Sequence, residues 1–213
     1  WWFRPSLSIN FEMANLKEIR TRINSVASTM QITSAMKMVS AAKLKRAQDA
    51  ITQMRPYAEK LREILVNISS TLEGSAEGIY SQEREINKVL IVAIASNRGL
   101  CGAFNANIFK AAENRIKEYA EKEVQIYAIG KRSADYFAGK HTVFNSNTEI
   151  FNNLNYEHVA LMAQEVMDAF VQGEFDKVEI IYNEFKNAAT QEVVTQQFIP
   201  VVSEENEEGD INA

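Results

Sequence analysis

Two short stretches of this 213-residue chain contain residue types whose spacing could support chemistry. In the first, "SNRGLCGAFN" from Ser96 to Asn105, Gly99 and Gly102 follow an apolar run, where α/β proteins often hold phosphates on a glycine-rich turn. The stretch lacks both G-x-G-x-x-G and the G-K-[ST] of a P-loop. We therefore favour a structural turn, in which Gly99 and Gly102 permit positive φ and close helix–strand packing, and we keep a nucleotide site as the alternative.

The second stretch, "ITSAMKMVSAAKLKRAQ" from Ile32 to Gln48, is rich in Ala, Met and Lys and predicts a helix. Residues 15–72 hold ten Lys or Arg and four Asp or Glu, a charge of +6, and since the whole chain carries −5, the remainder carries −11. An acidic partner would explain this basic segment, and so would a solvated helix face. The basic residues are spread along the helix without an aromatic platform, so we do not expect binding to nucleic acid.

Residue patterns for hydrolysis or metal binding are absent from the sequence. There is no G-x-S-x-G or H-E-x-x-H, and neither His141 nor His158 has a Cys or a second His at ligand spacing. The single cysteine, Cys101, is predicted to be a small buried packing residue. No run of about 18 apolar residues occurs, so we expect no insertion into a membrane. We predict a non-catalytic protein without cofactor or metal.

The basic stretch belongs to a helical pattern of unusual length. Between residues 16 and 72 apolar side chains recur every three or four residues, and this heptad stripe predicts a long coiled-coil helix that needs a partner helix. The stripe fails at Thr33, Lys37 and Ser40. An ordinary coiled-coil stutter explains the failure, and so does a contact zone that partners touch from several sides. Pro56 predicts a bend or a lost hydrogen bond farther along.

From residue 88 onward the pattern changes to strands that alternate with helices. Short apolar runs predict strands at 88–96, 124–130, 141–145, 177–185 and 192–201. Amphipathic stretches predict helices at 103–122, 131–139 and 156–173. The alternation predicts an α/β fold, a Rossmann-like and mostly parallel sheet with flanking helices, joined to the long N-terminal coiled-coil helix.

These patterns divide the chain into four parts after its first residues. They are a long helix at 13–73, a linker at 74–87, an α/β domain at 88–202 and an acidic tail at 203–213. Residues 1–12 fit none of these patterns, and we interpret them as added or upstream residues, with a targeting remnant as the weaker alternative.

Three separated motifs follow one another in a specific order along the chain. They are "LKEIRTRINSVASTMQITSAMKMVSAAKLKRAQ" at 16–48, "RPYAEKLREIL" at 55–65 and "SNRGLCGAFN" at 96–105. Together they closely resemble the gamma subunit of F-type ATP synthase, and the resemblance covers residues 13–202. The family commonly has Asp where this chain has Asn97, and we expect that difference to alter a hydrogen bond of the turn and little else.

The resemblance implies a rotor subunit of the central stalk. In this family the long helix is half of an antiparallel coiled-coil shaft inside a ring of alternating alpha and beta subunits. The α/β domain lies beside epsilon on the membrane c ring, and the shaft transmits torque to the catalytic beta subunits while gamma itself holds no nucleotide. This implies a peripheral location on the cytoplasmic face of the bacterial inner membrane, or on the matrix side in an organelle.

The same resemblance identifies residues that touch the surrounding subunits. The family's equivalent of residues 35–43 faces acidic levers on the beta subunits, so we expect Met36 and Lys37 to be rotor–stator contacts, with Lys43 and Arg46 adding electrostatic attraction. The family's shaft also contains a second long helix at the C-terminus, which is absent up to Ala213. We therefore expect the isolated chain to cover its apolar stripe by self-association or by repacking of the long helix.

Overall fold

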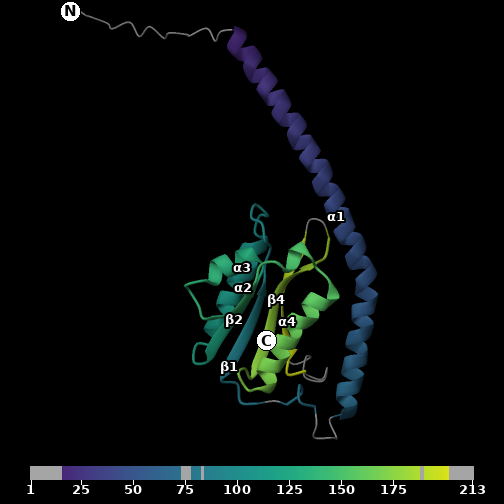
Figure 1. The fold of residues 1–213 in the computed structure, drawn as a ribbon, viewed down its shortest axis with the longest axis vertical. Coiled ribbons are helices and arrows are strands. Elements are labelled where there is room, and N and C mark those ends of the chain that lie inside the picture. Colours follow the sequence, from purple (N-terminus) through teal and green to yellow (C-terminus); the bar gives the residue numbers. More distant parts are fainter. Residues whose placement is uncertain (1–15, 73–77, 83, 188–189, 202–213) are drawn as a thin grey trace, which may run out of the picture. The chain divides into compact units, whose positions relative to one another are not determined.

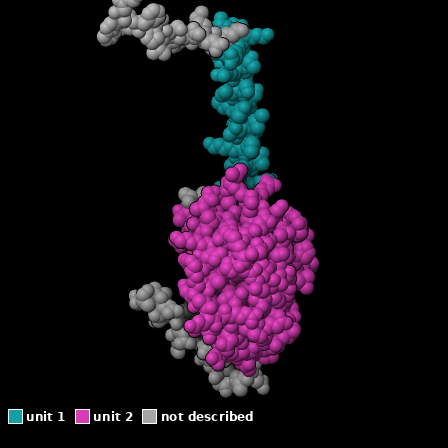
Figure 2. Space-filling view, turned by 90° about the vertical axis from the view of Figure 1, so that its left-hand side faces the viewer, with its two compact units in different colours: residues 1–63 teal, residues 64–213 magenta. Residues whose placement is uncertain are grey.

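A computed structural model describes residues 16–72, 78–82, 84–187 and 190–201 of the chain. The chain forms two compact units, residues 1–63 and residues 64–213, which Figure 2 shows in different colours. Helix α1 (Leu16–Leu72) supplies the described part of the first unit. The elements that follow in the second unit are β1 (Lys88–Ile94), α2 (Phe104–Glu118), β2 (Glu123–Ile129), α3 (Lys131–Phe137), β3 (Val143–Asn147), the 3-10 turn η1 (Ile150–Asn152), α4 (Tyr156–Val171), β4 (Lys177–Phe185) and β5 (Gln191–Ile199).

Helix α1 runs without interruption for 57 residues because its sequence contains no Gly and is rich in good helix formers. Pro56 lies inside the helix and does not end it. Four threonine hydroxyls within the helix donate to the backbone carbonyl four residues earlier, at 2.8–2.9 Å. These residues are Thr21, Thr29, Thr33 and Thr52. Nearly all of the side chains of α1 up to residue 65 are exposed.

The second unit is built on a five-stranded sheet with the order β3-β2-β1-β4-β5. Strands β1 to β4 run parallel to one another, and β5 pairs with β4 in the antiparallel direction. The sheet and its helices are drawn in Figure 1. The predicted α/β fold, with a mostly parallel sheet, flanking helices and a long N-terminal helix, is confirmed.

Strand β1 is apolar from Val89 to Ile94 because both of its faces are covered. Val89 and Ile91 belong to one core with Ile108 of α2, whereas Leu90 belongs to a second core with Phe170 of α4. All five side chains are fully buried. Burying a side chain of this size stabilises the fold by about 1.5–3 kcal/mol, so these two cores hold the sheet between its helices.

The residues just before β1 are attached to the connection between α4 and β4. The Asp176 carboxylate accepts hydrogen bonds from the backbone N–H groups of Asn87 and Lys88, at 2.9 and 2.8 Å. The Arg84 guanidinium donates to the Phe170 carbonyl at 3.0 Å and lies 4.8 Å from the centre of the Phe170 ring. These contacts fix the start of the central strand.

One carboxylate, Glu179 of β4, lies inside the second unit with 2% of its surface exposed. Arg115 of α2 donates to it through two nitrogens, the Tyr119 hydroxyl donates at 2.8 Å, and Lys177 Nζ lies 3.2 Å away. Burial by itself raises the pKa of Glu179, but the hydrogen bonds from Arg115 and Tyr119 and the charges of Arg115 and Lys177 outweigh it and hold this pKa below its usual range. The carboxylate therefore stays ionised and ties α2 to the sheet.

Candidate interaction surface

The predicted contact residues lie on an exposed, acid-free part of α1, residues 35–46, which we call the basic segment. Lys37, Lys43, Lys45 and Arg46 give it a charge of +4. Its methionines are open to solvent, with Met36 64% exposed. Among the residues that the structure describes, none of the four cations forms an ion pair, so their charge is available to a partner.

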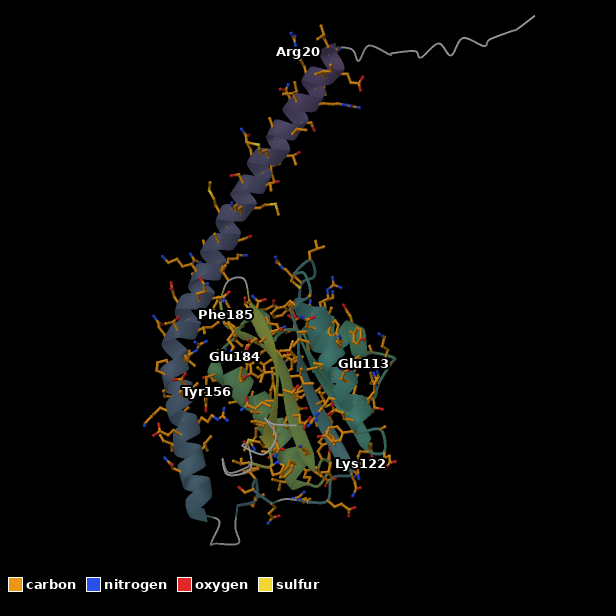
Figure 3. All side chains as sticks on the ribbon, turned by 180° about the vertical axis from the view of Figure 1, so that it is seen from behind. Arg20, Glu113, Lys122, Tyr156, Glu184 and Phe185 are labelled. Carbon is orange, nitrogen blue, oxygen red and sulfur yellow. The ribbon has the colours of Figure 1, made fainter. Side chains whose placement is uncertain are left out.

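The side chains of the basic segment point in several directions. Figure 3 shows side chains projecting on all sides of α1. Met36 and Lys43 are seven residues apart, which places them on almost the same side of the helix, whereas Lys37 and Arg46 are nine apart and differ in direction by about 180°. The four predicted residues are therefore brought onto one segment and not onto one face. One flat partner surface cannot touch all of them, because Lys37 and Arg46 point in opposite directions.

The second predicted feature, the turn of residues 96–105, leaves β1 and enters α2; we call it the glycine turn. Asn105 is 8% exposed and closes the turn from within. Its side-chain oxygen accepts from the backbone N–H and the hydroxyl of Ser96, both at 3.0 Å, and its Nδ2 donates to the Arg98 carbonyl at 3.3 Å. These donors are consequently engaged within the turn.

The two glycines of this turn have different physical roles. Gly102 has φ +61°, a conformation that glycine adopts at no steric cost. Gly99 does not have a positive φ, so that part of its prediction is wrong. A Cβ atom there would lie 2.7 Å from Arg132 Nη2, so this glycine lets the arginine approach. Leu100, which the sequence analysis did not single out, lies between them with φ 59° and a fully exposed side chain. An apolar side chain held outward in this rarely used conformation is a candidate contact.

Asn97 links the glycine turn to two other parts of the second unit. Its Nδ2 donates to the Thr148 carbonyl at 2.9 Å, and its Oδ1 accepts from the backbone N–H of Lys131 at 2.8 Å. An aspartate at this position could keep the second bond and not the first, since an ionised carboxylate has no donor. Asn97→Asp would therefore remove the hydrogen bond that joins the glycine turn to Thr148.

Cys101 is exposed, so the prediction that it is a buried packing residue is wrong. The two histidines are engaged in local contacts. His141 Nε2 lies 3.0 Å from a Glu113 carboxylate oxygen, and His158 Nδ1 lies 3.1 Å from the Asn153 carbonyl. Within the described ranges, no three His, Cys, Asp or Glu side chains come together to hold a metal ion. No helix in the described part of the chain is both long and apolar enough to cross a bilayer.

The sequence is similar to a known protein family. Residues 15–213 match the family model described as ATP synthase. The chain is 61% identical over 189 residues to an ATP synthase gamma chain of Flavobacterium johnsoniae, covering 89% of this chain and 66% of the relative. It is 42% identical over 198 residues to the corresponding chain of Geobacter metallireducens, covering 92% of this chain and 69% of the relative. The chain thus spans just under two thirds of the Flavobacterium relative.

Solved structures show the same fold. The central stalk and c-ring structure of the Tetrahymena thermophila mitochondrial ATP synthase contains a chain that matches with a TM-score of 0.65 and 26% identity, covering 79% of this chain and 72% of that one. A chain in the rotor structure of the Euglena gracilis mitochondrial ATP synthase matches with a TM-score of 0.59 and 21% identity, covering 84% of this chain and 61% of that one. The second likeness supports the fold alone.

Proposed function

Because this chain belongs to the family of ATP synthase gamma chains, the subunit of the central stalk, we propose that it transmits torque between the membrane c ring and the catalytic ring of alpha and beta subunits. The observation that carries this proposal is the basic segment. It holds four cations that no carboxylate of the described chain neutralises, and they are distributed around the helix. A surface of this kind suits a shaft that a surrounding ring contacts from every side.

Charge and flexibility of the side chains both suit a moving contact. Lys37, Lys43 and Arg46 would attract acidic segments of the beta subunits, and attraction between exposed charges changes little with small shifts in position. Met36 is an adaptable apolar side chain that can repack against different neighbours. Epsilon and the c ring are the proposed partners of the second unit, and the protein would lie peripherally on the cytoplasmic face of the bacterial inner membrane, or on the matrix side in an organelle.

We also propose that the chain holds no nucleotide and catalyses no reaction itself. The hydrogen bonds of Ser96 and Asn105 to each other and to Arg98 support this, because these groups do not face outward toward a ligand. The alternative is a nucleotide-binding α/β protein that uses the glycine turn. Calorimetry of the chain with ATP, ADP and NAD decides between them, since micromolar binding would favour the alternative.

The torque proposal is tested by reversing one charge of the basic segment. A gamma chain of the relatives' full length that contains this sequence is assembled with alpha and beta subunits, and ATP-driven rotation is measured for the unchanged protein, Lys37→Glu and Lys110→Glu. An exposed charge pair contributes up to about 1 kcal/mol, so we expect Lys37→Glu to slow rotation by about fivefold. Lys110 is exposed on α2 and gives a control with the same change in net charge. Equal rotation rates for all three proteins would reject the proposal.

A further inference from the structure

A groove of about 530 Å³ lies on the second unit, between the edge strand β3, the turn η1 and the first half of α4. Its lining combines a larger apolar surface with side-chain amides, hydroxyls, an imidazole and two carboxylates, and its described residues include no Lys or Arg. None of these residues belongs to α1 or to the glycine turn. The groove is therefore separate from the surfaces used by the function proposed above, and it combines apolar surface with two carboxylates.

The carboxylate of Glu165 on α4 is held in a defined orientation inside this groove. The hydroxyl of Tyr127 donates to its Oε2 at 2.9 Å, and Nδ2 of Asn145 donates to its Oε1 at 2.5 Å. Tyr127 is 2% exposed; burial, together with its bond to Glu165, raises the pKa of Tyr127, so the phenol remains a donor. Each carboxylate oxygen keeps a further lone pair. Over the described ranges, no cationic side chain forms an ion pair with Glu165.

A second carboxylate, Glu149, lines the groove just before η1. Its position is set by Asn147, whose side-chain oxygen accepts from the backbone N–H groups of Glu149 and Ile150 at 3.1 and 2.9 Å. Asn152 Nδ2 donates to the Glu149 carboxylate. The groove thus presents two oriented carboxylates whose local partners are neutral amides and a phenol.

Apolar side chains complete the lining. Ile150 is buried, with 5% of its surface exposed, whereas Leu161 of α4 is 70% exposed, and Met162 lies beside it in the sequence and also lines the groove. A ligand with an aliphatic chain can cover the exposed surface of Leu161, and methionine adapts to the shape of such a chain.

We propose that this groove binds a primary ammonium group carried on an aliphatic chain. The ammonium group would supply the positive charge that Glu165 and Glu149 lack, and its chain would lie along Leu161 and Met162. An anion would find no Lys or Arg in the described lining, and a neutral polyol would leave both carboxylates without a counter-charge. Such an ammonium group occurs on a free diamine and on the lysine side chain of a neighbouring protein.

Titration calorimetry of the chain with 1,4-diaminobutane tests the proposal, with 1,4-butanediol as the uncharged ligand of the same length. Two variants are compared, Glu165→Gln in the groove and Glu174→Gln at an exposed site outside its lining, so that both change the net charge equally. Removing a charge-assisted contact should weaken diamine binding by about tenfold or more in Glu165→Gln. Glu174→Gln should bind within about twofold of the unchanged protein.

Three results would overturn the proposal: no saturable binding of the diamine, equal binding of the diol, or equal weakening by the two variants. A second measurement uses the unchanged protein alone, so it remains decisive if Glu165→Gln fails to fold. In NMR titrations the side-chain amide signals of Asn145 and Asn147 should shift with the diamine, and unshifted signals would contradict the proposal. N-acetyl-lysine methylamide as a third ligand identifies the source, since tighter binding of this compound than of the diamine indicates a lysine side chain.

Discussion

The guanidinium of Arg115 on α2 and the carboxylate of Glu179 on β4 form a two-point ion pair, with Nε to Oε2 at 2.7 Å and Nη2 to Oε1 at 2.6 Å. A parallel pair of bonds of this kind is directional as well as strong. Because 64 residues separate the two partners in the chain, the pair closes a long loop and sets the position of α2 on the sheet. Its strength can be measured directly.

Arg115→Met should lower the free energy of unfolding of the chain by about 2–4 kcal/mol, because it leaves the buried Glu179 carboxylate with Lys177 as its remaining cation. The measurement is urea unfolding followed by circular dichroism. Lys186→Met is the control, since Lys186 pairs with Glu184 and Glu192 at an exposed site, and its loss should cost much less than that of Arg115. Similar decreases in the free energy of unfolding of the two variants would mean that the buried ion pair stabilises the chain no more than the exposed one.

The same carboxylate should make stability depend on pH in a defined direction. The pKa of Glu179 in the folded chain is lowered, so the stability it contributes is present above the pKa of an unfolded glutamate, about 4.3, and is lost as the pH falls below it. Glu179→Gln should therefore be less stable than the unchanged protein at pH 7, and the difference should shrink between pH 5 and pH 3. Urea unfolding at several pH values measures this, and two parallel curves would contradict it.

Gly130, at the start of α3, should tolerate no side chain. Its φ is +89°, and an added Cβ atom would lie 2.1 Å from the backbone carbonyl oxygen of Ala95. Gly139 has φ +76° and nothing within 4 Å of an added Cβ, so it isolates the cost of the backbone conformation. We expect Gly139→Ala to lower the free energy of unfolding by about 1–2 kcal/mol and Gly130→Ala to lower it by more than about 3 kcal/mol. Thermal unfolding of both variants shows whether Gly130→Ala is the more damaging change.

The parts of this fold that local pattern determines could be predicted from the sequence. The apolar run that became β1 indicated a strand covered on both faces, and alternating strands and helices indicated a parallel sheet. Contacts between distant residues could not be predicted. Glu179 lies in the strand sequence "KVEIIYNEF", and nothing near it shows that Arg115 will neutralise it. The sequence analysis assigned no element to the turn η1, because three residues are too few to show a helical period.

The candidate sites divide in the same way. The charge of the basic segment follows from its residue types, and the directions of its side chains follow from helix periodicity. Both are local properties of the sequence. The two bonds of Asn97 reach Lys131 and Thr148, 34 and 51 residues farther along, so its role as a link between loops needed the structure. The groove beside Glu165 likewise depends on β2, β3 and α4 coming together.

The apolar stripe of α1 should drive self-association of the isolated chain. Leu44, Ile51, Met54 and Leu61 follow one another along the predicted stripe and are 44%, 37%, 61% and 43% exposed. Burying one such side chain contributes about 1.5–3 kcal/mol, so two helices that cover each other's stripes form a favourable pair. Sedimentation of the chain over a range of concentrations should show association, and Ile51→Glu should weaken it by at least about tenfold, because each copy would bury a carboxylate. Gln53→Glu adds the same charge beside the stripe and should change the dissociation constant little; a chain that stays monomeric at every concentration would show that the stripe is covered in another way.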